Sequence, residues 1–476
     1  MRYLVFVLGL FLFAAAGGAD PYDDLRYNDV RQKASHNSYQ RDEGIISQLD
    51  YHRIHTIEFD LRLKRPFFLG GKGAPVGDWL TYHSPFEYFD TSCRTMSDCL
   101  ALVGAYHRAV PEHEVVTVFF DVDIDDGGHG LAAFEDAVKS MLPEDALFTP
   151  PDLMAACEEA ETLQESVTLA GCGWPFLSDL RGKIVPVVSG GRKDFIEQGY
   201  DPAESPVFII SSLSSGGIED YPDVVFFNMA GPNEKARTVR EAGFVTRLYY
   251  LNDPTGYEKA KELGAHILAT DMANYIEYPW AVTHNDRGFP FQPLEEDVRA
   301  GLPTDDDALG VRASGQCPLV TGWGEGAITM MVTGPGSQVD PDAAGCVFVR
   351  GGGKSFSLCK PADKRPVYAK WDGGMSSAGR REFKGYSPES VSFLRLSADQ
   401  DGCVVGEASV DLAEWNEIGR ACLGAAVEEA GIMVKAGNEE VKFRFRPLTT
   451  GLDLDDLSPE EDADCNAMEF RAGYLP

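Results

Sequence analysis

The sequence predicts an α/β fold class: a (β/α)8 TIM-like barrel followed by a second, β-rich domain that contains disulfides. Over about 250 residues, short β-branched or aromatic runs alternate with polar, helix-like segments, and this alternation is typical of a barrel. A doubly wound sheet is the alternative, but no Gly-rich phosphate loop follows a strand. From about residue 300 the residue pattern changes to that of Gly-rich turns and short strands, which predicts the second domain.

The elements can be placed in order along the chain. The expected barrel strands occupy residues 30–37, 55–63, 79–84, 114–123, 183–190, 207–213 or 224–229, 244–251 and 265–272. Helices are expected at 99–110 and 256–264 between them. In the second domain, residues 410–431 predict one helix among the strands, and the acidic segment 453–465 predicts a solvated tail.

The first residues have the layout of a secretory signal peptide. Arg2 precedes an apolar run, and small residues follow it up to Asp20, so we expect cleavage near Ala19. No later segment reaches about 18 consecutive apolar residues, which predicts a secreted chain without a transmembrane span; an uncleaved signal anchor is the alternative. The predicted organisation is a signal peptide at 1–19, a barrel at 20–298 and a β-rich domain of unknown role, with the acidic tail, at 299–476.

The ten cysteines all follow the expected signal peptide. An even number of cysteines in an oxidising compartment predicts disulfides. Short spacing favours the local pairs Cys93 with Cys99 and Cys157 with Cys172, whereas the pairing of the other six cannot be deduced. No cysteine pair has zinc-type C-x-x-C spacing, which argues against a metal thiolate site.

The charge balance restricts the possible partners. The formal net charge of −33 argues against a nucleic-acid partner and against a polybasic membrane anchor. The same charge would repel an anionic substrate unless a cation lies between them, so it favours a divalent metal ion at the site. Adaptation to a salty environment is an alternative explanation of the charge. The oligomeric state cannot be predicted.

Polar side chains end several of the expected strands, where the chemistry of a barrel collects. Period-two alternation places Glu58 with Asp60 on one face of a strand, and Asp121 with Asp123 on one face of another. The run of aspartates from 121 to 126 is not an EF-hand loop, because positions six and twelve hold Asp126 and Ala132. The other strand-end residues are His36, Asn37 and His83.

These residues predict a calcium site beside an acid/base pair. Asn37, Glu58, Asp60 and Asp121 offer an all-oxygen set of the kind that calcium prefers. His36 and His83 can donate or accept protons near neutral pH. Taken singly, each residue is better explained as an ordinary core or surface side chain, and only their joint position at strand ends favours a site.

Seven segments, in order, resemble the calcium-dependent phosphoinositide-specific phospholipases C of bacterial type. They are ASHNSY at 34–39, IEFDLR at 57–62, YHSPFEYFDTSCRTMSDCL at 82–100, EHEVVTVFFDVD at 112–123, LPEDALFTPPDL at 142–153, GWPFLSDLRGKIVPVVSG at 173–190 and GAHILATDM at 264–272. The resemblance covers roughly the first 300 residues.

The resemblance implies that His36 and His83 flank a scissile phosphodiester and that Asn37, Glu58, Asp60 and Asp121 hold Ca²⁺. It implies attack of the inositol 2-hydroxyl on phosphorus, which releases diacylglycerol and an inositol cyclic phosphate, at the head group of a phospholipid on a membrane surface.

One departure from the family pattern concerns the strand that ends at residue 123. The family reads Glu-x-Lys where this chain has Asp121-x-Asp123, so a cation that could meet phosphate is missing from this strand. Arg247 could supply a positive contact, with a surface salt bridge as the alternative. Competing predictions are a glycerophosphodiester or sphingomyelin-type phosphodiesterase on the same barrel, and a secreted binding protein whose barrel has lost activity.

Overall fold

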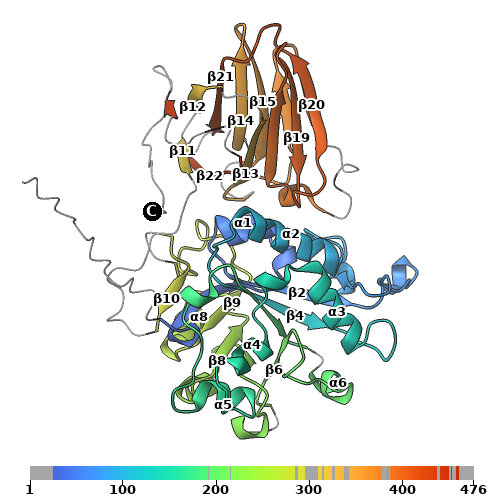
Figure 1. The fold of residues 1–476 in the computed structure, drawn as a ribbon, viewed down its shortest axis with the longest axis vertical. Helices are drawn as coiled ribbons and strands as arrows, with labels where there is room; N and C mark the ends of the chain where they lie inside the picture. The colour runs from blue at the N-terminus through green and yellow to red at the C-terminus, as the bar shows by residue number, and fades with distance from the viewer. Residues whose placement is uncertain are drawn as a thin grey trace, which may run out of the picture.

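The computed structural model describes most of the chain in two β-based bodies (Figure 1). The described residues are 25–190, 192–214, 216–284, 288–294, 309–313, 316–323, 327–336, 342–377, 383, 386–436, 440–449, 452 and 457–459. The expected signal peptide and its cleavage site lie outside these residues, as does the predicted domain boundary at residue 298. None of the described helices is long and apolar enough to cross a membrane.

The first body is a closed parallel barrel, which confirms the predicted fold class. Its strands follow one another around the barrel in sequence order, and β1 closes the ring by pairing with both β2 and β9. The barrel strands are β1 (Val30–Ser35), β2 (Thr56–Arg62), β4 (Val116–Val122), β5 (Ile184–Val188), β6 (Phe208–Ser211), β7 (Phe226–Ala230), β8 (Val245–Tyr249) and β9 (Ile267–Thr270). They read as nearly continuous apolar runs because the helices cover their outer face.

Helices connect the barrel strands, and both expected helices are present. The described helices are α1 (Ile45–Asp50), α2 (Met96–Ala109), α3 (Leu131–Met141), α4 (Pro150–Ala155), α5 (Leu163–Thr168), α6 (Arg192–Glu197), α7 (Lys235–Glu241) and α8 (Pro254–Glu262). A capping box begins α2, in which Thr95 and Asp98 each bind the other's backbone N–H. The N-cap Asp253 followed by Pro254 begins α8.

The expected third strand is not a barrel strand. Residues 79–84 yield only β3 (Leu80–Thr81), which pairs antiparallel with the end of β2. The segments 207–213 and 224–229, which were alternatives for one strand, contain the two barrel strands β6 and β7. A parallel crossover needs a helix-length connection, and the segment between β2 and β3 has only one short 3-10 helix, η3 (Phe67–Leu69), so the chain turns back on β2. Another short antiparallel strand, β10 (Phe291–Pro293), pairs with the start of β1.

The second body is a β-sandwich of two antiparallel sheets. The first sheet contains β11 (Leu309–Ala313), β22 (Val441–Pro447), β13 (Ala327–Thr333), β18 (Phe393–Ala398), β19 (Cys403–Ser409) and β20 (Asn416–Cys422). The second contains β17 (Gly374–Ser377), β16 (Tyr368–Trp371), β15 (Lys354–Pro361), β14 (Ala344–Gly351), β21 (Glu429–Lys435), β12 (Gln316–Gly322) and β23 (Ser458–Pro459). Apolar side chains of both sheets meet in the core.

The predicted helix at 410–431 is wrong, because this segment contains β20 and the start of β21. Cys422 pairs in register with Cys403 on β19 and is bonded to it, and Gly419 lies too close to Ala369 and Trp371 to carry a side chain. Sheet pairing therefore overrides the weak helix propensity of this alanine-rich and glutamate-rich segment. The acidic tail is also anchored in part, since Leu457 is buried and β23 pairs with β12.

Both predicted local disulfides are present, Cys93–Cys99 and Cys157–Cys172. In the second domain, Cys346 is bonded to Cys359 and Cys403 to Cys422. The described cysteines include no free thiol. Cys465 lies outside the described residues.

A buried ion cluster joins the two domains. Asp50 at the end of α1 accepts a hydrogen bond from the Thr333 hydroxyl at 2.6 Å and from Arg444 Nε at 3.3 Å, and its Oδ1 lies 3.6 Å from a terminal nitrogen of Arg446. Thr333 belongs to β13 and both arginines to β22, so one barrel carboxylate holds two strands of the sandwich. In Figure 1 these strands lie directly above α1.

Candidate active site

Strand ends carry the polar residues to one end of the barrel. His36 and Asn37 follow β1, and Asp60 and Asp121 lie side by side in the parallel register of β2 and β4. Arg247 comes from β8. Because parallel strands all finish at the same barrel end, these residues share the carboxyl-terminal mouth.

His36 is oriented by a carboxylate. Its Nδ1 lies 3.0 Å from Oδ1 of Asp271, which follows β9. Burial would raise the pKa of Asp271, but the hydrogen bond from His36 and the charge of Arg41 outweigh it and lower that pKa. An ionised carboxylate only accepts hydrogen bonds, so Nδ1 of His36 donates to Asp271, and Nε2 lies 4.0 Å from Glu58 Oε2. The rings of Tyr249 and Tyr250 flank the imidazole.

Asn37 has an unsatisfied oxygen. It adopts the left-handed conformation at φ 48°, which asparagine tolerates better than most residues, and its backbone N–H donates to Glu58 Oε2 at 3.2 Å. The side-chain Oδ1 is buried and accepts no hydrogen bond in the structure. Buried polar atoms are nearly always paired, so this oxygen is available to a donor or a cation.

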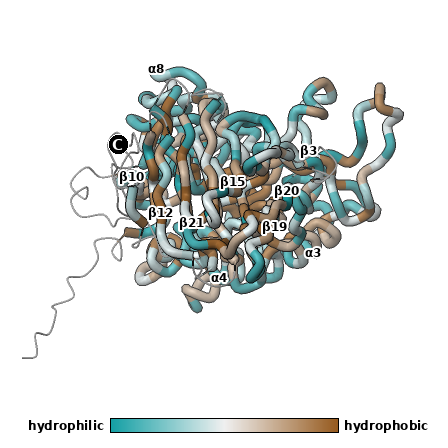
Figure 2. Tube along the Cα trace, turned by 90° about the horizontal axis from the view of Figure 1, so that it is seen from above, coloured by the Kyte–Doolittle hydropathy of each residue, from teal (hydrophilic) through white to brown (hydrophobic). Residues whose placement is uncertain are grey.

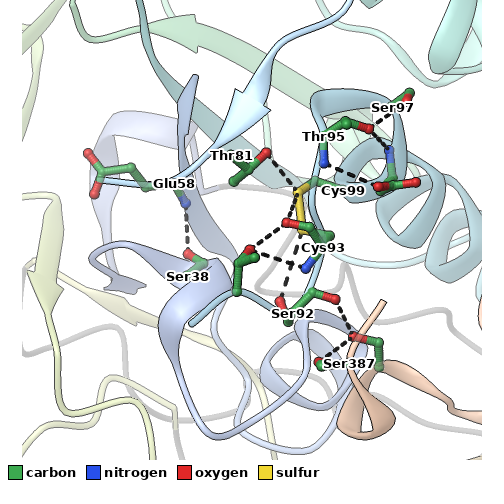
Figure 3. The surroundings of a disulfide bond; sticks show 12 residues. Ser38, Glu58, Thr81, Ser92, Cys93, Thr95, Ser97, Cys99 and Ser387 are labelled. Carbon is green, nitrogen blue, oxygen red and sulfur yellow. Dashed lines mark hydrogen bonds between the residues drawn. A yellow bond between two sulfur atoms is a disulfide. The ribbon is translucent and has the colours of Figure 1, made fainter. Parts of the chain in front are cut away.

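Glu58 and Arg247 form a buried ion pair. A terminal nitrogen of Arg247 lies 2.7 Å from Glu58 Oε2, and the other donates to Asn228 Oδ1 at 3.0 Å. The guanidinium also lies over the rings of Phe119 and Tyr249. Arg247 is 2% exposed, so the alternative of a surface salt bridge is wrong. Behind the pair, the Ser38 hydroxyl accepts the Glu58 backbone N–H at 2.8 Å (Figure 3).

Asp60 is buried among other acids. It is 1% exposed and accepts the Tyr39 hydroxyl at 3.0 Å. Burial, reinforced by the negative charges of Glu58 and Asp121, raises its pKa to about 8. The neighbourhood of Asp60 therefore carries more negative charge than its cations neutralise.

Arg62 is the cation that the sequence reasoning missed. Its guanidinium lies 3.0 Å from Asp121 Oδ2, 3.7 Å from Asp60 Oδ2 and 3.6 Å from Asp123 Oδ1. Period-two alternation places Arg62 on the face of Glu58 and Asp60, so the signal was present in IEFDLR. Arg62 supplies from β2 the positive charge that is missing from β4.

The carboxylate of Asp121 is held against the start of the loop after β5. A Cβ on Gly190 would come within 2.1 Å of Asp121 Oδ1, so only glycine allows this approach. Arg62 binds the other side of Asp121 through both its carboxylate and its backbone carbonyl. Asp123, two residues further along the chain, is half-exposed and lies outside this packed region.

The fit of these residues to a metal ion is mixed. No three His, Cys, Asp or Glu side chains of the described residues gather closely enough to hold a metal ion. The chemistry of the donor set nevertheless suits a hard cation, since Asn37 Oδ1 is unpaired and Asp60 is under-neutralised. Asn37, Glu58, Asp60 and Asp121 could hold such an ion once Arg62 turns away from Asp60 and Asp121.

His83 is at the rim of the mouth, apart from this network. The side chain is exposed, and its Nδ1 lies 3.9 Å from Glu87 Oε2. The preceding residue, Tyr82, donates its backbone N–H to Asp60 O at 3.1 Å, which places His83 next to the end of β2.

The Cys93–Cys99 disulfide secures the segment that carries His83. Figure 3 shows it beside Thr81, whose hydroxyl lies 3.5 Å from Cys99 Sγ. The Ser92 backbone N–H donates to Tyr39 O at 2.7 Å, so the same segment is tied to the loop after β1.

A polar cleft of about 280 Å³ opens beside Arg247. It lies at the ends of β5 to β8, and Asn228, the partner of Arg247, is part of its wall. Hydroxyl groups and one cation dominate the lining, which includes Ser189, Arg192, Ser211, Ser212, Asn228 and Tyr249. Such a lining can hydrogen-bond a small polyhydroxylated group. The sequence did not predict this serine-rich wall, nor Asp271 and Asn252, whose side-chain amide donates to Asp271 Oδ2, although Asp271 directly follows a predicted strand.

Comparisons with known proteins give similarities of fold. No protein-family model and no curated protein sequence matches the chain. Among solved structures, the chain is similar to the calcium-dependent phosphoinositol-specific phospholipase C of the Gram-negative bacterium Pseudomonas sp., at 20% identity and a TM-score of 0.47 over 58% of this chain and 97% of that chain. Its myo-inositol complex gives 20% identity and 0.46, over 57% and 96%.

A glycerophosphodiester phosphodiesterase of Parabacteroides distasonis is also similar, at 12% identity and a TM-score of 0.28, over 53% of this chain and 97% of that chain. At these values the similarities assign no activity, so the chemistry of the site rests on its own residues.

Proposed function

We propose that the barrel is a phosphodiesterase of the phospholipase C type, which cleaves phosphatidylinositol-type lipids with the help of calcium. The observation that carries this proposal is the convergence of an oriented imidazole, an unpaired buried amide oxygen and under-neutralised carboxylates at the barrel mouth. The order of the motifs from ASHNSY to GAHILATDM supports the same activity.

In the proposed reaction, the inositol 2-hydroxyl attacks phosphorus and the diacylglycerol oxygen leaves. His36, held by Asp271 with Nε2 toward the site, removes the proton of the hydroxyl or stabilises the phosphate. His83 protonates the leaving oxygen from the rim. The serine-lined cleft beside Arg247 binds the hydroxyl groups of the inositol ring.

Calcium belongs to this proposal as the ion held by Asn37, Glu58, Asp60 and Asp121. When bound, it would lower the pKa of the attacking hydroxyl and neutralise charge that develops on the phosphoryl oxygens. Arg62 then exchanges its carboxylate partners for the phosphate, since the same guanidinium fits both groups.

Incubation with phosphatidylinositol is the direct test of the activity. We expect inositol cyclic phosphate and diacylglycerol when calcium is present, and loss of both products when a chelator removes it. Product analysis by phosphorus NMR checks the result. Cleavage of glycerophosphoinositol or sphingomyelin in preference to phosphatidylinositol would favour the other phosphodiesterase functions. No product in either condition would favour a binding protein.

Asp60→Asn tests the calcium site by stability. Because the pKa of Asp60 is raised from 3.8 to about 8, its stabilising protonated form is fully present below about pH 4 and is lost as the pH rises through 8. In chelator, the melting temperature of the wild type should therefore fall between about pH 4 and pH 8 and level off above pH 8, and Asp60→Asn should remove this part of the fall. Calcium at pH 8 should stabilise the wild type, by about 2.7 kcal/mol at a hundredfold excess over Kd, but not the variant.

Asp123→Asn is the matched control for this measurement. Asp123 also contacts Arg62 but is half-exposed and is not among the proposed ligands. It should keep the calcium-dependent rise in melting temperature. Equal stabilisation of the wild type and of Asp60→Asn by calcium would exclude Asp60 as a ligand.

Export of the chain is also proposed. The disulfides of both domains form in oxidising compartments, and the first 19 residues have the pattern of a signal peptide. The proposed organisation remains a barrel from about residue 20 to 298 and a second domain from 299 to 476.

A further inference from the structure

Large exposed apolar side chains gather on one segment beside the candidate site. Of the nine found among the described residues, five lie between residues 67 and 89. Phe67 and Phe86 are 79% and 84% exposed, which is unusual for side chains of this size. The rings of Phe68 and Phe86 stack with centroids 6.1 Å apart, and Phe67 packs edge-on against Phe68. Two loops thus form one aromatic surface, defined by Phe67, Phe68 and Phe86, and the exposed Phe89 follows three residues after Phe86.

The loop that carries Phe67 is basic in an otherwise acidic chain. Between Asp60 and Asp78 the sequence has Arg62, Lys64, Arg65 and Lys72 and no acidic residue, although the chain has 75 acidic and 42 basic residues. Lys64, Arg65 and Lys72 are exposed, and none of them forms an ion pair with any described residue. Their positive charge is therefore available to an anionic partner.

The aromatic surface adjoins the mouth of the barrel. The basic loop begins where β2 ends, directly after Arg62, and η4 (Pro85–Glu87) brings Phe86 three residues beyond His83. Figure 2 shows the loops around β3 projecting from the body of the molecule with apolar residues on them. A flat partner that covers this surface would face the candidate site.

We propose that this segment is an interfacial anchor, which docks the barrel mouth on an anionic phospholipid bilayer. Exposed phenylalanines enter the boundary between head groups and acyl chains, while the adjacent lysines and arginine meet the lipid phosphates. Aromatic and basic residues together fit a bilayer better than a protein partner, because a bilayer offers an apolar boundary to the exposed phenylalanines and a layer of phosphates to the exposed cations of the same segment. The proposal deepens the proposed function, since it names the surface by which the site reaches a lipid.

Sedimentation with sucrose-loaded vesicles tests the anchor in the presence of a calcium chelator, so that binding is measured without turnover. We expect the wild type to bind vesicles of phosphatidylcholine and phosphatidylserine more tightly than vesicles of phosphatidylcholine alone. Phe67→Ser with Phe86→Ser should weaken binding about 10²-fold. Lys64→Ser, Arg65→Ser and Lys72→Ser together should cost about 10²-fold on the mixed vesicles and little on phosphatidylcholine.

Met375→Ser is the matched control, because Met375 is 68% exposed but belongs to β17 of the second domain. It should bind vesicles like the wild type. Failure of the wild type to sediment with mixed vesicles, or equal binding by the phenylalanine variant, would overturn the proposal. So would a wild-type dimer that Phe67→Ser with Phe86→Ser converts to a monomer, because a second copy would then cover the surface.

The test separates this proposal from the proposed function. Vesicle binding without cleavage of phosphatidylinositol, with or without calcium, would contradict the phospholipase activity and leave the anchor standing. If both hold, the phenylalanine variant should lose activity on vesicles and keep its rate on a water-soluble inositol phosphodiester.

Discussion

His83→Ala is expected to lower the turnover of phosphatidylinositol by about 10²- to 10⁴-fold, the range that a positioned general acid contributes. The side chain is exposed and its Nδ1 lies 3.9 Å from Glu87 Oε2 in an exposed pair, so its removal should leave folding and calcium binding unchanged. Initial rates on phosphatidylinositol and calcium titration by calorimetry measure the two effects separately.

The leaving group offers a sharper test of the role of His83. A substrate that releases nitrophenolate needs no protonation of its leaving oxygen, so His83→Ala should lose far less activity on it. His107 is a half-buried histidine on α2, and His107→Ala serves as the control. This variant should keep the wild-type activity on both substrates. An unchanged rate on phosphatidylinositol would show that His83 is not the acid.

Asp50→Ala is expected to destabilise the protein by about 3–5 kcal/mol, the usual cost of removing one partner from a buried ion pair. Burial alone would raise the pKa of Asp50, but the charges of Arg444, Arg446 and Arg53 outweigh it and hold that pKa well below its usual value of 3.8. Its stabilising charge is therefore present above pH 3.8 and is lost only as the pH falls through the lower folded value.

Chemical denaturation at pH 7 measures this effect, with fluorescence as the probe. Asp50→Ala removes the Asp50 carboxylate from the buried Arg444 and Arg446, so the contact between the domains should fail first and the barrel and sandwich should unfold in separate steps. Glu417→Ala, which breaks an exposed ion pair with Arg420, should not shift the midpoint measurably. A midpoint for Asp50→Ala equal to that of the wild type would contradict a structural role for the cluster.

Much of the candidate site could be predicted because barrel chemistry follows strand ends. The alternation in TIEFDL placed Glu58 and Asp60 on one face, and the structure brings them to the mouth with His36, Asn37 and Asp121. The ion pairs of Arg62 could not be predicted without knowing that β2 and β4 are neighbours, because its partners Asp121 and Asp123 lie 59 and 61 residues away along the chain. The pairing of His36 with Asp271 depended in the same way on the closure of the barrel.

The sequence by itself determined the barrel, the second β-rich domain and the local disulfides, because these follow from the nearby alternation of apolar and polar residues and from short cysteine spacing. Only the tertiary structure decided that β3 turns back on β2, that residues 410–431 contain strands and that Arg62 sits among three aspartates. Propensity is a weak local preference, whereas strand pairing and buried charge are satisfied by partners distant in the chain, and these partners decide the outcome.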